Sequence, residues 1–264
     1  SDKNKLIITQ RKKLQESIEY TRKIQDVMFD SFYDIKEHFD NHFVFYLAKE
    51  TVGGDYYGYK KMEGKHLVFC VDCSGSGVFG AFLSMVCNAV VEQAINVAKT
   101  KTPKEILNYV QGALHQIMEE DESSFLNKER INMSFYLIDK HEKNILYSST
   151  YSYALLCNGS KVEKIEPQNK SIEFIQNGFN QTFLEDSLKY NEGDMLYMLT
   201  NGYIDQYGGD VQSKFTIEKL ENFVRKINPL DVKEQNSLVE EKFIKWKGFN
   251  AQTDDIIMIG LRLC

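Results

Sequence analysis

The chain has 264 residues, of which 42% are hydrophobic and 12% aromatic, enough to fill the core of one large domain or two small ones. Its 32 basic and 38 acidic residues give a net charge of -6, which argues against a surface for nucleic acid or for an anionic membrane. No apolar run approaches the roughly 18 to 20 residues of a transmembrane helix, and the basic start lacks the apolar core of a signal peptide. We therefore expect a soluble, cytoplasmic chain that neither binds nucleic acid nor inserts into a membrane.

The cysteines form an odd, scattered set that fits reduced intracellular thiols better than a disulfide framework. They are Cys70, Cys73, Cys87, Cys157 and Cys264. Cys70 and Cys73 make a C-x-x-C, but positions three apart on a strand face opposite sides, and no second pair completes a zinc site. This spacing argues against a redox or zinc function.

The first thirty or so residues are predicted to form one helix, since they are highly charged and lack Gly and Pro. Ile7, Leu14, Thr21 and Met28 lie seven residues apart, which gives a heptad-like stripe. Two interpretations stay open: a helix that lies on its own domain, or a signalling helix that dimerises through residues 5–28 and follows an upstream sensor. We assign residues 1–32 to this helix and residues 33–264 to one domain.

From about residue 42, short apolar or alternating runs predict β-strands. In chain order they are HFVFYLAKE, DYYGYKKM, HLVFCVDC, INMSFYLID, NILYSST, YALLCN, DMLYMLT and the closing DDIIMIGLRL. Turn signals such as MEGK, DKHEKN and NGSK separate consecutive runs, so several strands should pair as antiparallel hairpins.

Four helical stretches lie among these strands, at residues 77–99, 103–120, 216–227 and 231–247. The second opens with Thr102-Pro103, a capped start with proline in the first turn. Because hairpin strands and grouped helices do not alternate as in a parallel sheet, the pattern predicts an α+β fold.

A G-x-G-x-x-G motif, Gly75 to Gly80, follows a predicted strand and opens a helix, as in a dinucleotide-binding turn. The helix is followed by another helix instead of a parallel strand, and Asp72 precedes the glycines where it would repel phosphate. Nucleotide binding is therefore disfavoured.

Polar oxygen-bearing residues recur at predicted strand ends along the whole chain. Asp55 follows two glycines, Asp72 lies at the end of the strand in FCVDCSG, Asn201 follows DMLYMLT, and Asp254-Asp255 precede the last strand. Each alone is most simply a turn residue. Together they are hard ligands of the kind that Mg²⁺ or Mn²⁺ prefers, and two ions roughly 3.5 to 4 Å apart could activate a water molecule and clamp a phosphate.

The ordered segments VGGDYY, VDCSGSGVFGAFLSM, LTNGYIDQYGG and TDDIIMIGLR resemble the SpoIIE-like branch of the metal-dependent protein phosphatases, the PPM or type 2C serine/threonine phosphatases. The segment SIEYTRKIQDVMF resembles the helix that joins this domain to an upstream sensor. The resemblance implies a four-layer α-β-β-α sandwich of two antiparallel sheets flanked by helices, preceded by an N-terminal helix. It also implies a site for two Mg²⁺ or Mn²⁺ ions on top of the sandwich.

The resemblance assigns metal-site positions to residues of this sequence. The implied ligands are Asp55, Asp72, the carbonyl of Cys73, Asn201 and Asp254, with Gly54, Gly202 and Asp255 in supporting positions. No side chain of the chain is expected to act as the nucleophile, because water activated by the ions does so.

The sequence also departs from the family pattern. Asn201 stands where the family has Asp, Gly75-Ser76-Gly77 replaces G-H-G, and SSTYSYA at 148–154 brings two tyrosines into a stretch of small residues. The segment INMSFYLID lacks the Asp and Gly often found before its strand. Replacing the family's aspartate by Asn201 removes one negative charge, and with it a Coulomb attraction to a cation of at most about 4 kcal/mol at 4 Å and a dielectric constant near 20. We therefore expect one weakened ion site.

Two functions follow from these observations. The first is a metal-dependent hydrolase of phosphoserine or phosphothreonine on a partner protein. The second is a catalytically inactive pseudophosphatase that binds a partner or relays a signal through its N-terminal helix. The amide at Asn201 weighs against full activity.

Overall fold

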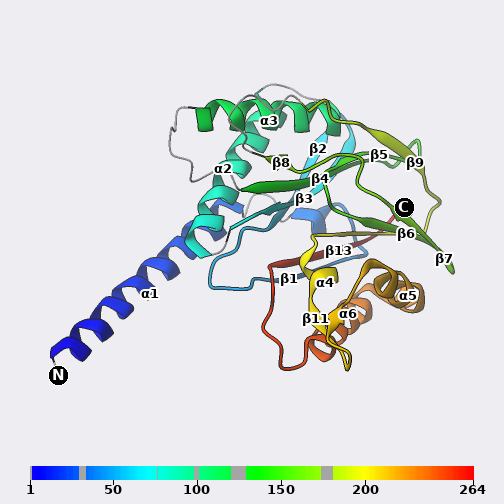
Figure 1. Ribbon diagram of the computed structural model, residues 1–264. Coiled ribbons are helices and arrows are strands. Elements are labelled where there is room, and N and C mark those ends of the chain that lie inside the picture. Colours follow the sequence, from blue (N-terminus) through cyan, green and yellow to red (C-terminus); the bar gives the residue numbers. More distant parts are fainter. Residues whose placement is uncertain (1, 30–33, 76, 98–100, 120–128, 174–180) are drawn as a thin grey trace.

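The computed structural model describes residues 2–29, 34–75, 77–97, 101–119, 129–173 and 181–264. Two antiparallel sheets form its centre (Figure 1). The first contains, in order, β1 (His42–Leu47), β13 (Ile256–Arg262), β10 (Met195–Leu199), β6 (Ala154–Asn158) and β7 (Lys161–Ile165). The second contains β2 (Tyr56–Met62), β3 (Lys65–Cys73), β4 (Arg130–Asp139), β5 (Asn144–Ser149) and β9 (Asp186–Lys189), with β8 (Ile172–Glu173) paired to β4.

Helices cover the outer face of each sheet. Helices α2 (Gly77–Asn96) and α3 (Pro103–Glu119) pack on the second sheet, and α5 (Ile217–Ile227) and α6 (Val232–Lys247) pack on the first. The predicted four-layer α-β-β-α sandwich, of α+β class, is confirmed. Because α3 follows α2 directly and no parallel strand comes between them, the G-x-G-x-x-G turn has no βαβ unit.

The layers explain why the central strands read as nearly continuous apolar runs, since both faces of each sheet are covered. On β3, Phe69 and Val71 face the cluster under α2 and α3, whereas Val68 and Cys70 face the first sheet. Cys73 lies on the helix side, so the two cysteines of the C-x-x-C face opposite layers as predicted.

The predicted helices are present with small shifts at their ends. Thr102 caps α3, because its Oγ1 accepts a hydrogen bond from the Glu105 N–H at 3.3 Å. The predicted ends at residues 99 and 120 lie outside the described residues. Several short or polar elements are not predicted from the sequence: η2 (Asp34–Glu37), β7, β8, β9, α4 (Gly202–Asp205), β11 (Tyr207–Gly208) and β12 (Ser213–Lys214).

Within the described residues, α2 is one helix whose length and composition would allow it to cross a membrane. It is largely buried, with Ala81, Cys87 and Val91 packed in the cluster shared with β3. Its apolar character is accounted for by its packing between the second sheet and α3.

Helix α1 (Asp2–Phe29) extends away from the two-sheet body, and only its C-terminal end reaches α2 (Figure 1). There Phe29 stacks on Tyr56 with ring centroids 4.8 Å apart, and Gln25 Nε2 donates to Gly53 O (2.7 Å) and Ser84 Oγ (3.0 Å). The helix is thus anchored beside the loop that precedes β2. The predicted boundary at residues 32 and 33 lies outside the described residues.

Candidate metal centre

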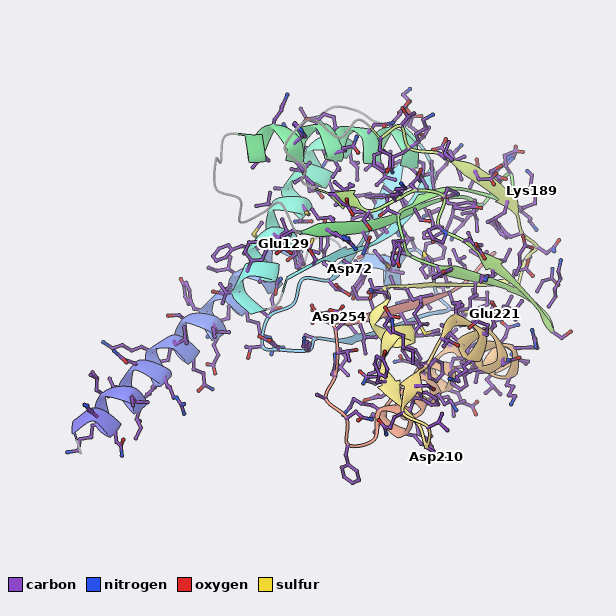
Figure 2. All side chains as sticks on the ribbon, in the orientation of Figure 1. Asp72, Glu129, Lys189, Asp210, Glu221 and Asp254 are labelled. Carbon is purple, nitrogen blue, oxygen red and sulfur yellow. The ribbon has the colours of Figure 1, made fainter. Side chains whose placement is uncertain are left out.

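A pocket of about 310 Å³ lies where the ends of the two sheets meet. Figure 2 shows Asp72, at the end of β3, and Asp254, in the loop before β13, approaching the same region. The pocket is lined by Lys49, Glu50, Val52, Asp72, Ser74, Gly75, Gly77, Asn132, Asn201, Thr253, Asp254 and Asp255. Four of the residues singled out from the sequence, Asp72, Asn201, Asp254 and Asp255, are therefore brought together from distant parts of the chain.

Asp72 is buried at the end of β3, and its carboxylate is held from the neighbouring strand β4. Asn132 Nδ2 donates to Asp72 Oδ2 at 3.1 Å, and Ser171 Oγ donates to Asn132 Oδ1 at 2.6 Å. Burial raises the pKa of Asp72 to about 7, against the opposing hydrogen bond from Asn132 and with the help of the charges on Asp254 and Asp255. The ionised carboxylate is therefore unfavourable in this environment, and a bound cation would stabilise it.

Asp55 lies immediately before β2 and is 2% exposed, although it does not line the pocket itself. Its Oδ2 has no hydrogen-bond partner within the described residues. Burial raises the pKa of Asp55 well above its usual value, and the charge on Asp72 raises it further. Asp55 and Asp72 are thus near neighbours whose negative charges oppose each other.

Asn201 precedes the short helix α4 at the end of β10. Its side chain makes no capping hydrogen bond, and its Oδ1 is a buried oxygen with no hydrogen-bond partner among the described residues. A buried polar atom without a partner is unfavourable unless another group satisfies it. Asn201 therefore offers an uncommitted oxygen beside the acidic pocket.

The two adjacent aspartates before β13 have different surroundings. Asp255 is buried and accepts hydrogen bonds from the N–H groups of Lys49 (2.7 Å), Gly54 (2.6 Å) and, at 3.4 Å, Asp55. Asp254 is half-buried, and its Oδ1 accepts from the N–H of Asp255 at 2.9 Å. Burial raises the pKa of Asp254, while the nearby Lys49 opposes that shift. Asp255 ties the loop before β2 to the last strand and leaves Asp254 in the pocket.

Two glycines allow the backbone to close around the site. A Cβ on Gly54 would lie 2.3 Å from the carbonyl oxygen of Cys73, and a Cβ on Gly202 would lie 1.9 Å from the carbonyl oxygen of Asp255. Both distances are far inside van der Waals contact with rigid backbone atoms. Side chains at these positions would push apart the segments that carry the acidic residues.

The donor set suits a hard divalent cation, because it consists of carboxylate and amide oxygens, two of which have no hydrogen-bond partner in the described part of the chain. Among the described residues, however, no three His, Cys, Asp or Glu side chains form a group that could hold a metal ion. The ligand roles of Asp55, Asp72, Cys73, Asn201 and Asp254 therefore stay predictions.

A second pocket of about 280 Å³ shares Asn201 with the first. The two tyrosines noted in the sequence, Tyr151 and Tyr153, line it, together with Lys214, which forms an ion pair with Asp205 at 2.8 Å. Tyr151 has a φ of 52°, a conformation that costs energy for an aromatic residue.

Among the pocket residues that could not be identified from the sequence are Asn132, Lys49 and Glu50. Asn132 is a polar side chain inside the apolar run INMSFYLID, which was the available signal. Lys49 and Glu50 lie in a charged loop segment, where charge alone does not distinguish a site residue from a solvated one.

Comparison with known families decides the relationship. The family model for stage II sporulation protein E (SpoIIE) matches residues 62–263. The chain belongs to the SpoIIE family. This confirms the resemblance to the SpoIIE-like branch, and the matched range contains Asp72, Asn201 and Asp254 but begins after Asp55. A search of curated proteins found no match.

Solved structures share the fold of this SpoIIE family member at low sequence identity. The SiaA-PP2C domain of Pseudomonas aeruginosa aligns with a TM-score of 0.85 and 21% identity, covering 96% of this chain and 98% of that one. The PP2C phosphatase domain of SpoIIE from Bacillus subtilis, with a fragment of its regulatory domain, gives 0.65 and 17% over 84% and 62%. RsbX in complex with magnesium gives 0.60 and 17% over 84% and 94%.

Proposed function

We propose that this SpoIIE family member is a metal-dependent protein serine/threonine phosphatase that acts on a phosphorylated signalling protein, with activity weakened by Asn201. The proposal is supported by the family match and by structural neighbours that include two PP2C domains and RsbX in complex with magnesium. The observation that carries it is that two buried oxygens, Asp55 Oδ2 and Asn201 Oδ1, have no hydrogen-bond partner among the described residues. The charge of Asp72 acts on Asp55, and Asn201 lines the same pocket as Asp72.

In this proposal Asp55, Asp72, Asn201, Asp254 and the carbonyl of Cys73 would hold up to two Mg²⁺ or Mn²⁺ ions. Such ions neutralise phosphate charge and lower the pKa of water at a phosphoryl centre. Asp255 keeps the loop before β2 in place, and Asn132 orients Asp72. Among the described residues that line the pocket, Lys49 is the one basic residue, and it would attract the phosphate of the substrate.

The second candidate function is a pseudophosphatase that binds a signalling partner without hydrolysis. The observation that favours it is the amide at Asn201, together with the lack of a three-member ligand group among the described His, Cys, Asp and Glu side chains. Either function leaves the fold and the acidic pocket unchanged.

Hydrolysis of a chromogenic phosphate ester with Mn²⁺ distinguishes the two. We expect slow, Mn²⁺-dependent turnover by the native chain and none by Asp72→Ala. Asp210→Ala serves as the matched control, because Asp210 is exposed and lies away from the pocket (Figure 2). No turnover by the native chain, with measurable turnover by Asn201→Asp, would support the pseudophosphatase. Turnover that survives in Asp72→Ala would contradict the phosphatase site.

We further propose that the chain acts in the cytoplasm and that α1 links it to an upstream sensor and pairs with a second copy. Ile7 and Leu14 on this helix are 47% and 61% exposed, so the stripe they form has room for a partner. Sedimentation of the native chain should show a dimer, and Ile7→Glu with Leu14→Glu should yield a monomer. A native monomer at all concentrations would reject the pairing.

A further inference from the structure

A groove of about 230 Å³ lies between α5 and α6 and shares no lining residue with the acidic pocket. Three aromatic side chains, Phe215, Phe223 and Trp246, contribute its apolar lining. Phe215 is buried, and its ring meets that of Trp246 edge-on with centroids 5.2 Å apart, so this floor is fixed by packing.

The lining side chains of the groove come from one face of each helix, as their spacing in the sequence indicates. On α5, Lys219, Phe223 and Lys226 follow the i, i+4, i+7 spacing that places side chains on one helical face. On α6, Lys242 and Trp246 are four residues apart and take the facing side. Each wall therefore brings lysine beside an aromatic ring, and Asn222 adds a neutral polar group between them.

The groove is basic although the whole chain carries a net charge of -6. No carboxylate lines it among the described residues. Lys219 Nζ lies 4.5 Å from the Trp246 ring centroid and donates to the carbonyl oxygen of Lys214 at 2.9 Å, so it is committed locally.

The other two lysines are available to a partner. Lys226 is exposed, and Lys242 is half-buried with its Nζ 6.0 Å from the Phe215 ring centroid. Neither makes an ion pair with a described residue. Acidic side chains of the two helices, such as Glu221 and Glu241, lie outside the groove lining.

We propose that this groove docks an acidic peptide segment of a partner protein that carries one large apolar side chain. The apolar side chain packs on Phe223 and Trp246, and flanking carboxylates pair with Lys226 and Lys242. An aromatic floor without carboxylates fits such a segment better than it fits a free anion, because a small anion gains nothing from apolar contact. The docking is independent of hydrolysis and holds for an active or an inactive acidic pocket.

Trp246 allows a direct test, because it is the single tryptophan of the chain. Its emission is followed while a short peptide of Asp and Glu around one central Leu is added to the full chain without metal. We expect a saturable change, lost when Lys replaces the acidic residues and weakened when Ala replaces the Leu. No saturable change at millimolar peptide, or an equal response to the basic peptide, would overturn the proposal.

Charge reversal locates the binding site. Lys226→Glu with Lys242→Glu should weaken peptide binding by about tenfold or more, whereas Lys245→Glu should leave it unchanged. Lys245 lies on the same helix but outside the groove and is exposed. Equal affinity in the double variant and the native chain would overturn the proposal. Binding of vesicles with anionic lipid, without binding of the peptide, would assign the groove to a membrane surface instead. The native chain with its peptide panel remains decisive if the double variant unfolds.

Discussion

Strands β3 and β10 end beside the same pocket, and they bring side chains of different charge to it. Each strand is largely buried and apolar and has a polar residue near its end, Asp72 just before the last residue of β3 and Asn201 two residues after β10. A glycine then opens the next helix in both cases. At the end of β3, Asp72 carries an ionisable carboxyl group that accepts a hydrogen bond from Asn132. After β10, Asn201 carries a neutral amide, and its Oδ1 has no hydrogen-bond partner among the described residues.

The difference shows how one amide changes the electrostatic balance of the site. Asp55, Asp72 and Asp254 already have pKa values raised by burial and by neighbouring carboxylates. Asn201 spares the metal-free chain one more buried negative charge, but it also removes attraction for a divalent cation. The missing negative charge at Asn201 thus both increases the stability of the metal-free chain and lowers its affinity for a divalent cation.

The largest expected effect comes from adding a side chain at Gly202, where the backbone after β10 packs against the carbonyl oxygen of Asp255. Gly202→Ala should lower the free energy of unfolding by about 3 kcal/mol or more, because its Cβ would meet the carbonyl oxygen of Asp255 at 1.9 Å. Gly112→Ala is the control, since Gly112 lies in α3 with nothing within 4 Å of an added Cβ, and it should stabilise slightly. Thermal unfolding measures both, and an unchanged midpoint in Gly202→Ala would contradict the close packing.

The next effect concerns the charged end of β3. Because the folded state holds the pKa of Asp72 near 7 against an ordinary value of 3.8, folding favours the protonated acid, and stability falls as pH rises between these values. In metal-free buffer, the free energy of unfolding of Asp72→Asn should therefore rise relative to that of the native chain by a few kcal/mol between pH 4 and pH 7, since each pKa unit is about 1.4 kcal/mol. Above pH 7 the difference should change little. Urea unfolding at a series of pH values tests this. A difference between the two chains that does not change with pH would show that Asp72 ionises freely.

A smaller effect follows from adding the charge that β10 lacks. Asn201→Asp should lower metal-free stability by about 1–2 kcal/mol, because it places another carboxylate among buried acids, and Mn²⁺ should raise its unfolding temperature more than it raises that of the native chain. Asn222→Asp is the matched control, since Asn222 is exposed on α5 and its Oδ1 faces Arg225 at 3.0 Å. Equal responses of both variants to Mn²⁺ would separate Asn201 from the metal centre.

The smallest effect tests the support beneath Asp72. Asn132→Leu removes the donor at 3.1 Å and should weaken Mn²⁺ binding by up to about tenfold, with a smaller loss in Ser171→Ala, which removes the donor to Asn132. Fluorescence-detected or calorimetric metal titration ranks the variants. A larger loss in Ser171→Ala than in Asn132→Leu would contradict the order of this chain of hydrogen bonds.

Much of the fold could be predicted because the central strands carry their signal locally. Buried runs such as MLYML in β10 are apolar along their whole length, and the turns between hairpins contain Gly and Asn. Strands β7 (KVEKI) and β9 (DSLK) were missed because they are largely exposed and polar, so they exist through pairing with β6 and β5.

The site could be predicted only as separate residues. Asp55 and Asp255 are 200 positions apart, and the 3.4 Å contact from the Asp55 N–H to Asp255 Oδ2 depends on the pairing of distant strands. Family resemblance, not spacing, placed these residues together in the sequence analysis. The role of Asn132 depends on its register opposite Asp72 between β4 and β3, which a single sequence does not contain.

Calorimetric titration with Mn²⁺ tests the central claim most directly, namely that these strand ends form a metal centre weakened by one amide. We expect saturable binding by the native chain, binding at least about tenfold tighter by Asn201→Asp, a difference of about 1.4 kcal/mol, and none by Asp72→Ala. No binding by the native chain or by Asn201→Asp at millimolar Mn²⁺ would contradict the claim. Undiminished binding by Asp72→Ala would place the ion elsewhere.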